Sequence, residues 1–272
     1  MNFRQELPLN LFRKMMCGVV ALLSICATSV QAATVFQDNF NRVGPLNGST
    51  PSTTAGSNWT AHPGFSTDGT KVSAAFGLFD FYGAAYVPMP VAITSGNVYT
   101  LSATMLRGLS TDDTAIMIFG FFDATPSYNG TVPVDEGHAI AIAPRNNRPS
   151  VNTMLHGSVN NADYGVADGT NGTTFGVRLY ETAPNTWSAV AVELSPTNQL
   201  ITGGLSPTPI SLARIADIHS IGMISSSLLP PYIDNFTLDV SPVVPEPSTF
   251  VLGIAGLAGL RLVTLRKNSP RA

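Results

Sequence analysis

The sequence predicts an all-β protein: an antiparallel β-sandwich, preceded by a signal peptide and followed by a single C-terminal transmembrane helix. Apolar residues in the middle of the chain recur at every second position within short segments. Clusters of Gly, Pro, Asn and Asp separate these segments, as turns separate the strands of an antiparallel sheet. Only 11% of the residues are charged while 44% are hydrophobic, which excludes a disordered chain and suits an exported β protein.

Residues 1–32 are the predicted signal peptide. Basic residues precede an apolar run over 15–27, and Val30 and Ala32 give the small-residue pattern that signal peptidase recognises. The alternatives are a buried helix or an uncleaved anchor, but the run is short for a membrane span and ends in a polar stretch. We therefore expect the mature chain to be exported and to start at Ala33.

Cysteine content and charge limit the function of the mature chain. Cys17 and Cys26 both lie in the signal peptide, so the mature protein has no disulfide, thiol nucleophile or cysteine-bound metal. Residues 33–241, the predicted ectodomain, contain seven basic and fifteen acidic residues, a net charge of −8. Nucleic-acid binding requires a basic surface, and this charge argues against it.

The ectodomain is predicted to consist of short strands. Alternation of apolar and polar residues predicts strands at 98–105, 138–143, 174–180 and 186–193. The fully apolar run 115–122 fits a central strand, and 213–219 fits one short helical turn. Many short strands with frequent turn signals are typical of a sandwich or barrel.

Two similar tripeptides mark the ends of the ectodomain. Asp38-Asn39-Phe40 lies in an opening strand and Asp234-Asn235-Phe236 in a closing strand, with Trp59 some twenty residues after the first. This arrangement resembles the concanavalin A-like jelly rolls found in many bacterial surface proteins. The resemblance implies that the first and last strands lie side by side.

Asp38 and Asp234 are the candidate metal ligands. On a period of two, Asp38 shares its face with Phe36 and Phe40, and Asp234 shares its face with Phe236 and Leu238. An inward carboxylate needs a partner. A shared structural calcium is one interpretation. The other is that each Asp accepts backbone N–H bonds in an Asx-type turn, or that a bulge turns it outward.

Catalytic motifs are absent from the sequence. Concanavalin A-like glycan hydrolases carry Glu-x-Asp-x-x-Glu on one strand, and none of Glu136, Glu181 and Glu193 lies in such a motif. Residues 135–138 (Asp-Glu-Gly-His) read as a solvated turn, and the histidines lack zinc-ligand spacing. We therefore expect a non-catalytic protein without a cofactor. The alternative is a polysaccharide-processing enzyme of the concanavalin A-like class with an unrecognised active site.

Polysaccharide binding is the specific activity that the sequence favours. Tyr128 and Tyr164 lie in long polar loops and offer flat rings for stacking on sugars, with Arg145 and Arg148 as hydrogen-bond donors. The two tryptophans lie in strand-like contexts and are expected in the core.

The segment 242–272 is the predicted sorting tail. The motif 244–249 is followed by an apolar stretch to about residue 265, the predicted transmembrane helix, and by basic residues that hold the C-terminus on the cytoplasmic side. The motif residues are Val244, Pro245, Glu246, Pro247, Ser248 and Thr249, and the basic residues are Arg261, Arg266, Lys267 and Arg271. Arg261 interrupts the apolar stretch, a departure from the usual pattern that leaves a marginal membrane anchor.

This tail resembles the PEP-CTERM sorting signal of Gram-negative bacteria. The resemblance implies recognition by an exosortase, cleavage near the Pro-Glu-Pro motif, and delivery of the protein from the inner membrane to the cell surface or extracellular matrix. The partners it implies are signal peptidase, exosortase, the inner membrane as a transient anchor, and the cell's own exopolysaccharide.

Overall fold

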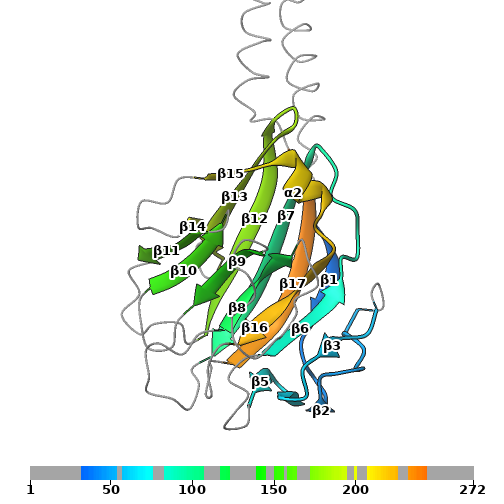
Figure 1. The fold of residues 1–272 in the computed structure, drawn as a ribbon. Helices are drawn as coiled ribbons and strands as arrows, with labels where there is room; N and C mark the ends of the chain where they lie inside the picture. Colours follow the sequence, from blue (N-terminus) through cyan, green and yellow to red (C-terminus); the bar gives the residue numbers. More distant parts are fainter. Residues whose placement is uncertain are drawn as a thin grey trace, which may run out of the picture. The chain divides into compact units, whose positions relative to one another are not determined.

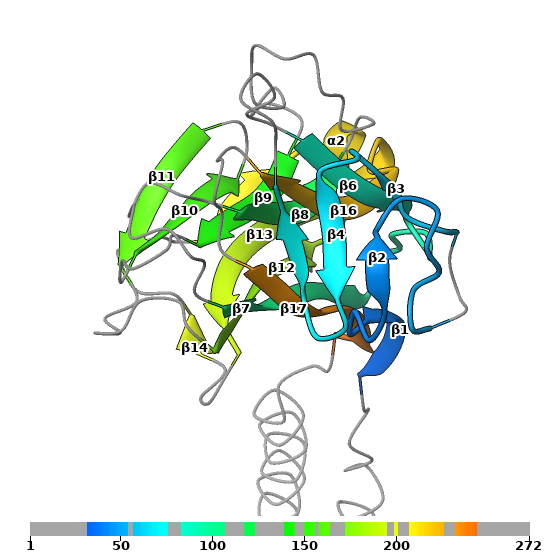
Figure 2. The ribbon, with the colours of Figure 1, turned by 90° about the horizontal axis from the view of Figure 1, so that it is seen from below.

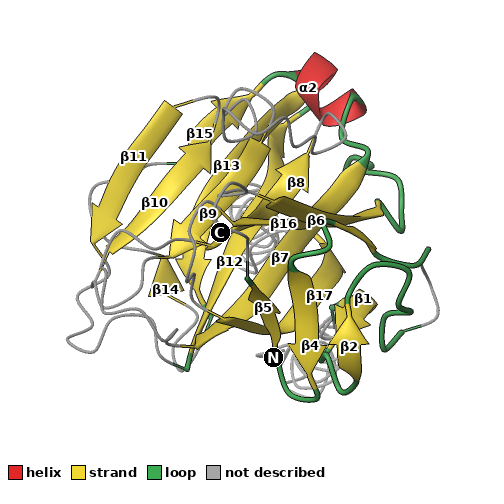
Figure 3. Cartoon of the chain, turned by 60° about the horizontal axis from the view of Figure 1, so that its bottom comes forward, coloured by secondary structure: helices red, strands yellow, loops and turns green. Residues whose placement is uncertain are grey.

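The computed structural model describes two antiparallel β-sheets packed face to face (Figure 1). The described residues are 32–53, 57–75, 83–106, 117–122, 139–144, 150–155, 158–163, 172–194, 199–200, 207–225 and 232–243. The two layers are seen in Figure 2, and Figure 3 shows that strands dominate both. The predicted fold class, an all-β antiparallel sandwich, is confirmed.

Ten strands of the described chain form the larger sheet and seven form the smaller one. The larger sheet contains β1 (Ala33–Asp38), β2 (Val43–Pro45), β4 (Phe65–Asp68), β5 (Val72–Ala74), β7 (Asn97–Leu106), β12 (Thr173–Ala183), β13 (Thr186–Glu193), β14 (Gln199–Leu200), β15 (Thr208–Ile210) and β17 (Tyr232–Pro242). The smaller sheet contains β3 (Thr60–Ala61), β6 (Gly83–Pro88), β8 (Met117–Phe122), β9 (Ala139–Pro144), β10 (Ser150–Leu155), β11 (Ser158–Asp163) and β16 (Ser220–Ser225).

The strand order explains how the sandwich closes. The larger sheet runs β14-β13-β12-β7-β17-β5-β4-β2, and the smaller sheet runs β11-β10-β9-β8-β16-β6-β3. The chain crosses from one sheet to the other on both sides of β3, β6, β7 and β16, and between β11 and β12. These crossings place strands that are consecutive in sequence in opposite layers, as in a jelly roll.

The predicted strands agree with the observed ones. β13 has the predicted bounds, and β7, β9 and β12 lie within a few residues of theirs. β8 is buried along its whole length and lies between β9 and β16, as a central strand should. The predicted helical turn is α2 (Leu212–Ala216), whose first turn is capped by the Ser211 side chain accepting from the Arg214 backbone N–H.

The core fills the space between the sheets. Alternate residues of β7 and β12, such as Leu101 and Val177, meet Phe119 of β8 and Met223 of β16 in one cluster. β1 pairs antiparallel with β17, with Phe36 opposite Leu238. The first and last strands of the described chain therefore lie side by side, as the resemblance implies.

Two glycines of the smaller sheet allow its strands to approach closely. A Cβ at Gly222 would meet the carbonyl oxygen of Ala85 and the backbone of Tyr86, and one at Gly120 would meet Ala141. Gly222 of β16 lies opposite Gly120 of β8, and Tyr86 of β6 and Ala141 of β9 continue the row on either side. A side chain at either glycine would push the strands apart.

No helix within the described part of the chain has the length and hydropathy needed to cross a membrane. Residues 1–31 and 244–272 lie outside the described residues. The predicted signal peptide, sorting motif, transmembrane helix and basic tail therefore stay predictions, as do the domain boundaries.

Candidate functional site

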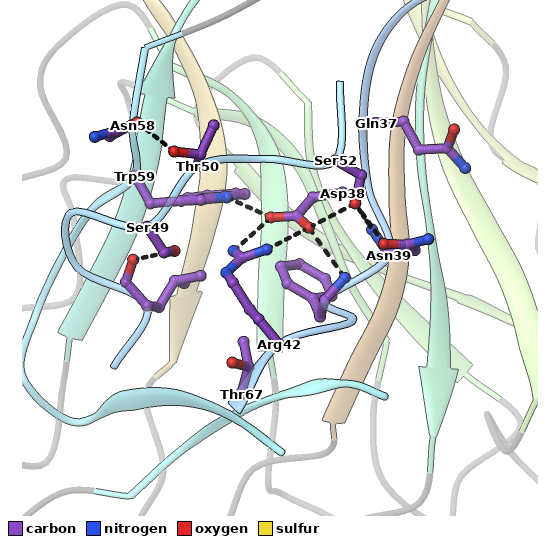
Figure 4. Close-up of polar contacts among 12 residues, drawn as sticks. Gln37, Asp38, Asn39, Arg42, Ser49, Thr50, Ser52, Asn58, Trp59 and Thr67 are labelled. Carbon is purple, nitrogen blue, oxygen red and sulfur yellow. Dashed lines mark hydrogen bonds and ion pairs between the residues drawn. The ribbon is translucent and has the colours of Figure 1, made fainter. Parts of the chain in front are cut away.

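A buried carboxylate lies where β1 ends. Asp38 is 0% exposed, and Arg42 donates two hydrogen bonds to its two oxygens, at 2.8 and 2.7 Å. The indole Nε1–H of Trp59 donates to Oδ2 at 2.6 Å (Figure 4). Arg42 follows Asp38 by four residues, whereas Trp59 reaches it from a loop between β2 and β3. The carboxylate thus ties β1 to the chain that follows it.

Two more donors complete this arrangement. The backbone N–H of Phe40 donates to Oδ1 of Asp38 at 3.0 Å, and the Ser52 hydroxyl lies 3.3 Å from the same oxygen. Phe40 has a φ of +52°, an unfavourable conformation for a bulky residue, and this bond together with its burial holds it there. With five donors on two oxygens, the carboxylate has little capacity left for another ligand.

Aromatic rings surround this carboxylate. Trp59 lies 6.0 Å from Phe36 and 6.2 Å from Phe40 between ring centroids. Phe236 of β17 lies 5.7 Å from Trp59 and 6.2 Å from Phe119 of the smaller sheet. The cluster of Phe36, Phe40, Trp59, Phe119 and Phe236, called the aromatic clasp below, therefore joins the first strand, the last strand and the opposite sheet.

The prediction that Asp234 faces inward with Phe236 and Leu238 is wrong. Ile233 and Phe236 are both buried, Asp234 is half-buried and Asn235 is exposed, so the alternation breaks between them. The pairing of β17 with β7 shifts register between Asp234 and Thr237, and Asn235 has a φ of +51°. A bulge thus turns the carboxylate away from the core.

Local bonds and nearby charges set the state of Asp234. Its two oxygens accept from the backbone N–H and the side-chain amide of Asn235, at 2.7 and 2.9 Å. Burial raises the pKa of Asp234, and the charges of Asp38 and Asp68 raise it further, against a lowering by the Asn235 backbone bond. These bonds and the bulge match the interpretation of Asx-type contacts rather than a shared ion. Among the described residues, no group of three or more His, Cys, Asp or Glu is placed to hold a metal.

The outer face of the larger sheet carries a polar surface across β17, β7 and β12. Residues alternating with the core positions of these strands point outward. Several of them are partly exposed, whereas Ser102, which lies between Thr100 and Thr104, is only 5% exposed. We call this surface the polar strip: Thr100, Thr104, Thr174, Arg178, Tyr180 and Asp239. The strand pairings place Asp239 beside Thr100, and Thr100 beside Arg178.

Hydrogen bonds order parts of the polar strip. The hydroxyls of Thr104 and Thr174 lie 2.9 Å apart on neighbouring strands, and Thr34 of β1 donates to Asp239 at 2.6 Å. Burial lowers the pKa of Arg178, against a smaller raising effect of Tyr180, so its guanidinium is partly desolvated. The strip therefore presents hydroxyls, a cation and a carboxylate in rows about 4.8 Å apart.

The outer face of the smaller sheet differs. Ile118, Phe122 and Ile224 lie on it, all at most 3% exposed and in contact with Ala84 and Ala141. Among the described residues, the centre of this outer face is therefore apolar, whereas the polar strip lies on the larger sheet.

Glu193 is a buried acid that the sequence analysis left without a role. It is 9% exposed and shares the inward parity of Trp187, Ala189 and Ala191 at the end of β13. Burial raises the pKa of Glu193. The period-two pattern of 186–193 could have identified this burial. It places Glu193 at an inward position at the end of the strand, where a carboxyl group meets the core.

Four predicted glycan-binding residues, Tyr128, Tyr164, Arg145 and Arg148, lie outside the described residues, as do residues 135–138. Trp59 and Trp187 are 1% and 2% exposed, so the prediction that they belong to the core is confirmed. The polar strip was missed, although the polar positions of 98–105 and 174–180 are its sequence signal.

No family model matches this chain. No curated protein matches it either. Solved structures with a similar backbone include a peanut lectin, 11% identical, covering 79% of this chain and 100% of that chain at a TM-score of 0.46. The carbohydrate recognition domain of Emp47p is 12% identical, covering 80% and 100% at a TM-score of 0.43. The exoplasmic/lumenal domain of VIP36, in a form bound to Ca²⁺ and Man2, is 9% identical, covering 79% and 93% at a TM-score of 0.43. Since these TM-scores are below 0.5, no property of the three proteins is carried over to this chain.

Proposed function

We propose that this chain is an exported, non-catalytic protein of the cell surface or extracellular matrix, which binds polysaccharide and is released from the inner membrane by an exosortase. The observation that supports binding is the polar strip on the open face of the larger sheet. The signal-peptide pattern and the Pro-Glu-Pro tail support export and sorting.

The chemistry of the polar strip suits a polyhydroxylated ligand. The hydroxyls of Thr100, Thr104 and Thr174 can donate and accept hydrogen bonds. Arg178 can donate them and Asp239 can accept them. Neighbouring sugar hydroxyls can therefore act as donors or as acceptors toward the strip. Tyr180 adds a ring at one end of the strip. Such open sites bind weakly, with Kd in the millimolar to micromolar range, about −4 to −8 kcal/mol. Many copies on one surface raise the overall strength by multivalency.

The loop residues Tyr128 and Tyr164 form a second proposed contact, together with Arg145 and Arg148, which lie between them in sequence. Stacking of a tyrosine ring on a sugar face removes apolar C–H surface from water. The strip and the loops are different parts of the chain, so substitutions distinguish them.

A binding experiment tests the proposal. The purified mature protein is titrated with the producing cell's exopolysaccharide, and release of reducing ends is followed in parallel. We expect binding without new reducing ends. Thr100→Val, which removes a hydroxyl and keeps the shape, should weaken binding several-fold, and Thr60→Val on β3 of the smaller sheet is the matched control.

The outcomes separate the alternatives. A loss of binding in Tyr164→Ala but not in Thr100→Val would place the ligand on the loops. Sustained release of reducing ends would establish the polysaccharide-processing enzyme instead. Absence of binding to the native polymer in every variant would refute the binding half of the proposal.

The interpretation of Asp38 and Asp234 as ligands of a shared structural calcium has a clear test. A metal at Asp38 would have to replace hydrogen bonds from Arg42, Trp59 and the Phe40 backbone. We therefore expect EDTA to leave the melting temperature unchanged. A fall that calcium restores, and that Asp234→Asn abolishes, would establish the metal site.

A further inference from the structure

The polar residues on the outer face of the larger sheet lie in rows that cross its strands. One row joins Asp239 of β17, Thr100 of β7 and Arg178 of β12, and Val190 of β13 follows on the far side. Val190 is only 3% exposed, so the polar part of this row ends at β12. Neighbouring strands lie about 4.8 Å apart, and the three polar side chains therefore span about 10 Å.

The rest of the polar strip carries little charge. Thr104 and Thr174 form a second row, in which their hydroxyls lie 2.9 Å apart. Ser102 and Gly176 lie opposite each other between the two rows, and neither has a charged side chain. The six residues of the polar strip therefore contain one cation and one carboxylate, and both lie in the row that crosses at Thr100.

The other lysine and arginine side chains of the described residues offer no surface for binding repeated anions. Arg42 donates two hydrogen bonds to the carboxylate of Asp38 (Figure 4). The Nζ atom of Lys71 lies 3.6 Å from Oδ2 of Asp68. Arg214 lies on α2 and not on a strand of the sheet. A polymer with a carboxylate or sulfate on every repeat would therefore meet one guanidinium in the polar strip, whereas binding of repeated anions requires a cluster of cations.

The overall charge of the ectodomain also disfavours an anionic ligand. Residues 33–241 carry a net charge of −8, which repels a polyanion at low ionic strength. A polycation would be attracted by this charge, but its specific binding requires a row of carboxylates. Asp239 is the one carboxylate among the six strip residues, and it already accepts a hydrogen bond from Thr34 at 2.6 Å.

We propose that the polar strip binds an uncharged polysaccharide, whose repeats carry hydroxyl groups but no carboxylate, sulfate, phosphate or ammonium group. This inference rests on the proposed polysaccharide binding and specifies the class of polymer. Hydroxyls of such a polymer accept hydrogen bonds from Arg178 and the threonines, and donate them to Asp239. The affinity then comes from hydrogen bonds to neutral groups, so it does not depend on the net charge of either partner.

The first test separates the producing cell's exopolysaccharide by ion exchange into acidic, basic and uncharged fractions. The purified protein is titrated with each fraction at about 0.01 M and about 1 M NaCl, where the Debye length is about 30 Å and about 3 Å. We expect binding to the uncharged fraction, with a Kd that differs less than about twofold between the two salt concentrations. Binding confined to a charged fraction and lost at high salt would overturn the inference and leave polysaccharide binding in place. Absence of binding to every fraction would refute the proposed function, and this inference with it.

The second test changes the two charges of the polar strip one at a time. Arg178→Gln and Asp239→Asn each remove a charge and keep hydrogen-bonding groups, so we expect each to weaken binding to the uncharged fraction by up to about tenfold without creating a salt dependence. Asp217→Asn, at the exposed C-cap of α2, removes the same charge outside the strip and should leave binding unchanged.

The opposite responses have separate meanings. Tighter binding by Asp239→Asn together with loss of binding by Arg178→Gln would indicate an anionic ligand and overturn the inference. Salt-independent binding that neither strip variant changes would overturn the assignment to the polar strip, while polysaccharide binding would stand. Melting temperatures of the three variants show whether each domain remains folded.

Discussion

At the scale of single residues, Asp38 shows how a charged side chain is accommodated in a core. Its charge is balanced by Arg42, and its remaining capacity is used by Trp59, Phe40 and Ser52. Because all these partners come from residues 38–59, the carboxylate organises the start of the domain. Asp234 lies in a similar tripeptide but in a different environment, because its side chain lies on a bulge.

The first residue-scale prediction concerns this ion pair. Asp38→Asn should lower the free energy of unfolding by about 3 kcal/mol, because it leaves the Arg42 guanidinium largely buried without a countercharge. Asp68→Asn is the matched control. The Asp68 side chain is 53% exposed and lies 3.6 Å from Lys71, so its loss should cost less than about 1 kcal/mol. Urea unfolding measures both, and equal effects would contradict the role given to Asp38.

A second residue-scale prediction concerns Glu193. Burial raises the pKa of Glu193 above its ordinary value of 4.5, so the folded state holds a proton that the unfolded state releases in the window above that value. The carboxyl group should therefore lower the free energy of unfolding as the pH rises through this window. Below the window it should have no such effect. Glu193→Gln should melt at a higher temperature than the unaltered chain at pH 7, with the difference vanishing near pH 4. A difference that is independent of pH would contradict this account.

At the scale of elements, the smaller sheet depends on the close approach of neighbouring strands, and the larger sheet depends on the strand β17. Gly120 and Gly222 leave no space for a side chain, whereas β17 lies between β7 on one side and β1 and β5 on the other. The smaller sheet thus depends on its two glycines, and the larger sheet depends on the strand β17.

The element-scale prediction compares two glycines. Gly222→Ala should destabilise the domain by about 1–3 kcal/mol or more, because its Cβ would press on the backbone of Ala85 and Tyr86. Gly176→Ala on β12 should cost less, since its nearest contacts would be at 3.1–3.2 Å and include flexible ends of Leu194 and Val192. Thermal melts of both variants give the order, and the reverse order would contradict the packing argument.

At the scale of the whole molecule, the two outer faces of the sandwich differ in kind. On the smaller sheet the outer side chains of Ile118, Phe122 and Ile224 are buried, while the larger sheet presents the polar strip. The ends of β1 and β17 lie together, so the described domain begins and ends at one place in the larger sheet. Polysaccharide binding and sorting, as proposed, would therefore use the same sheet.

A prediction at this scale tests the dependence of the domain on its last strand. A chain over 33–243 should unfold in one cooperative transition, because it contains both sheets and the complete aromatic clasp. A chain over 33–231 lacks β17 and should have no cooperative transition in circular dichroism or urea, because β1 and β7 lose their shared neighbour and Phe236 leaves the core. A stable 33–231 chain would contradict this dependence.

The sequence by itself determined the fold class, the positions of several of the longer strands, the short helix and the burial of both tryptophans. The reason is that a period of two reports directly which residues of a strand face a core, and turn residues mark where strands end. Trp187 and Leu101 could be assigned to the core in this way.

Only the tertiary structure decided which residues far apart in the sequence are in contact, and which way a side chain points where a strand is irregular. Asp38 obtains Trp59 as a partner across 21 positions, and Asp234 loses its inward direction because a single bulge reverses parity for one stretch of strand. Which sheet face stays open depends on what packs over each layer. The polar strip comes from strands whose apolar and polar residues alternate, whereas the buried Ile118 comes from a fully apolar strand. The sequence shows that difference, but only the tertiary structure shows that the outer side chain of Ile118 is covered.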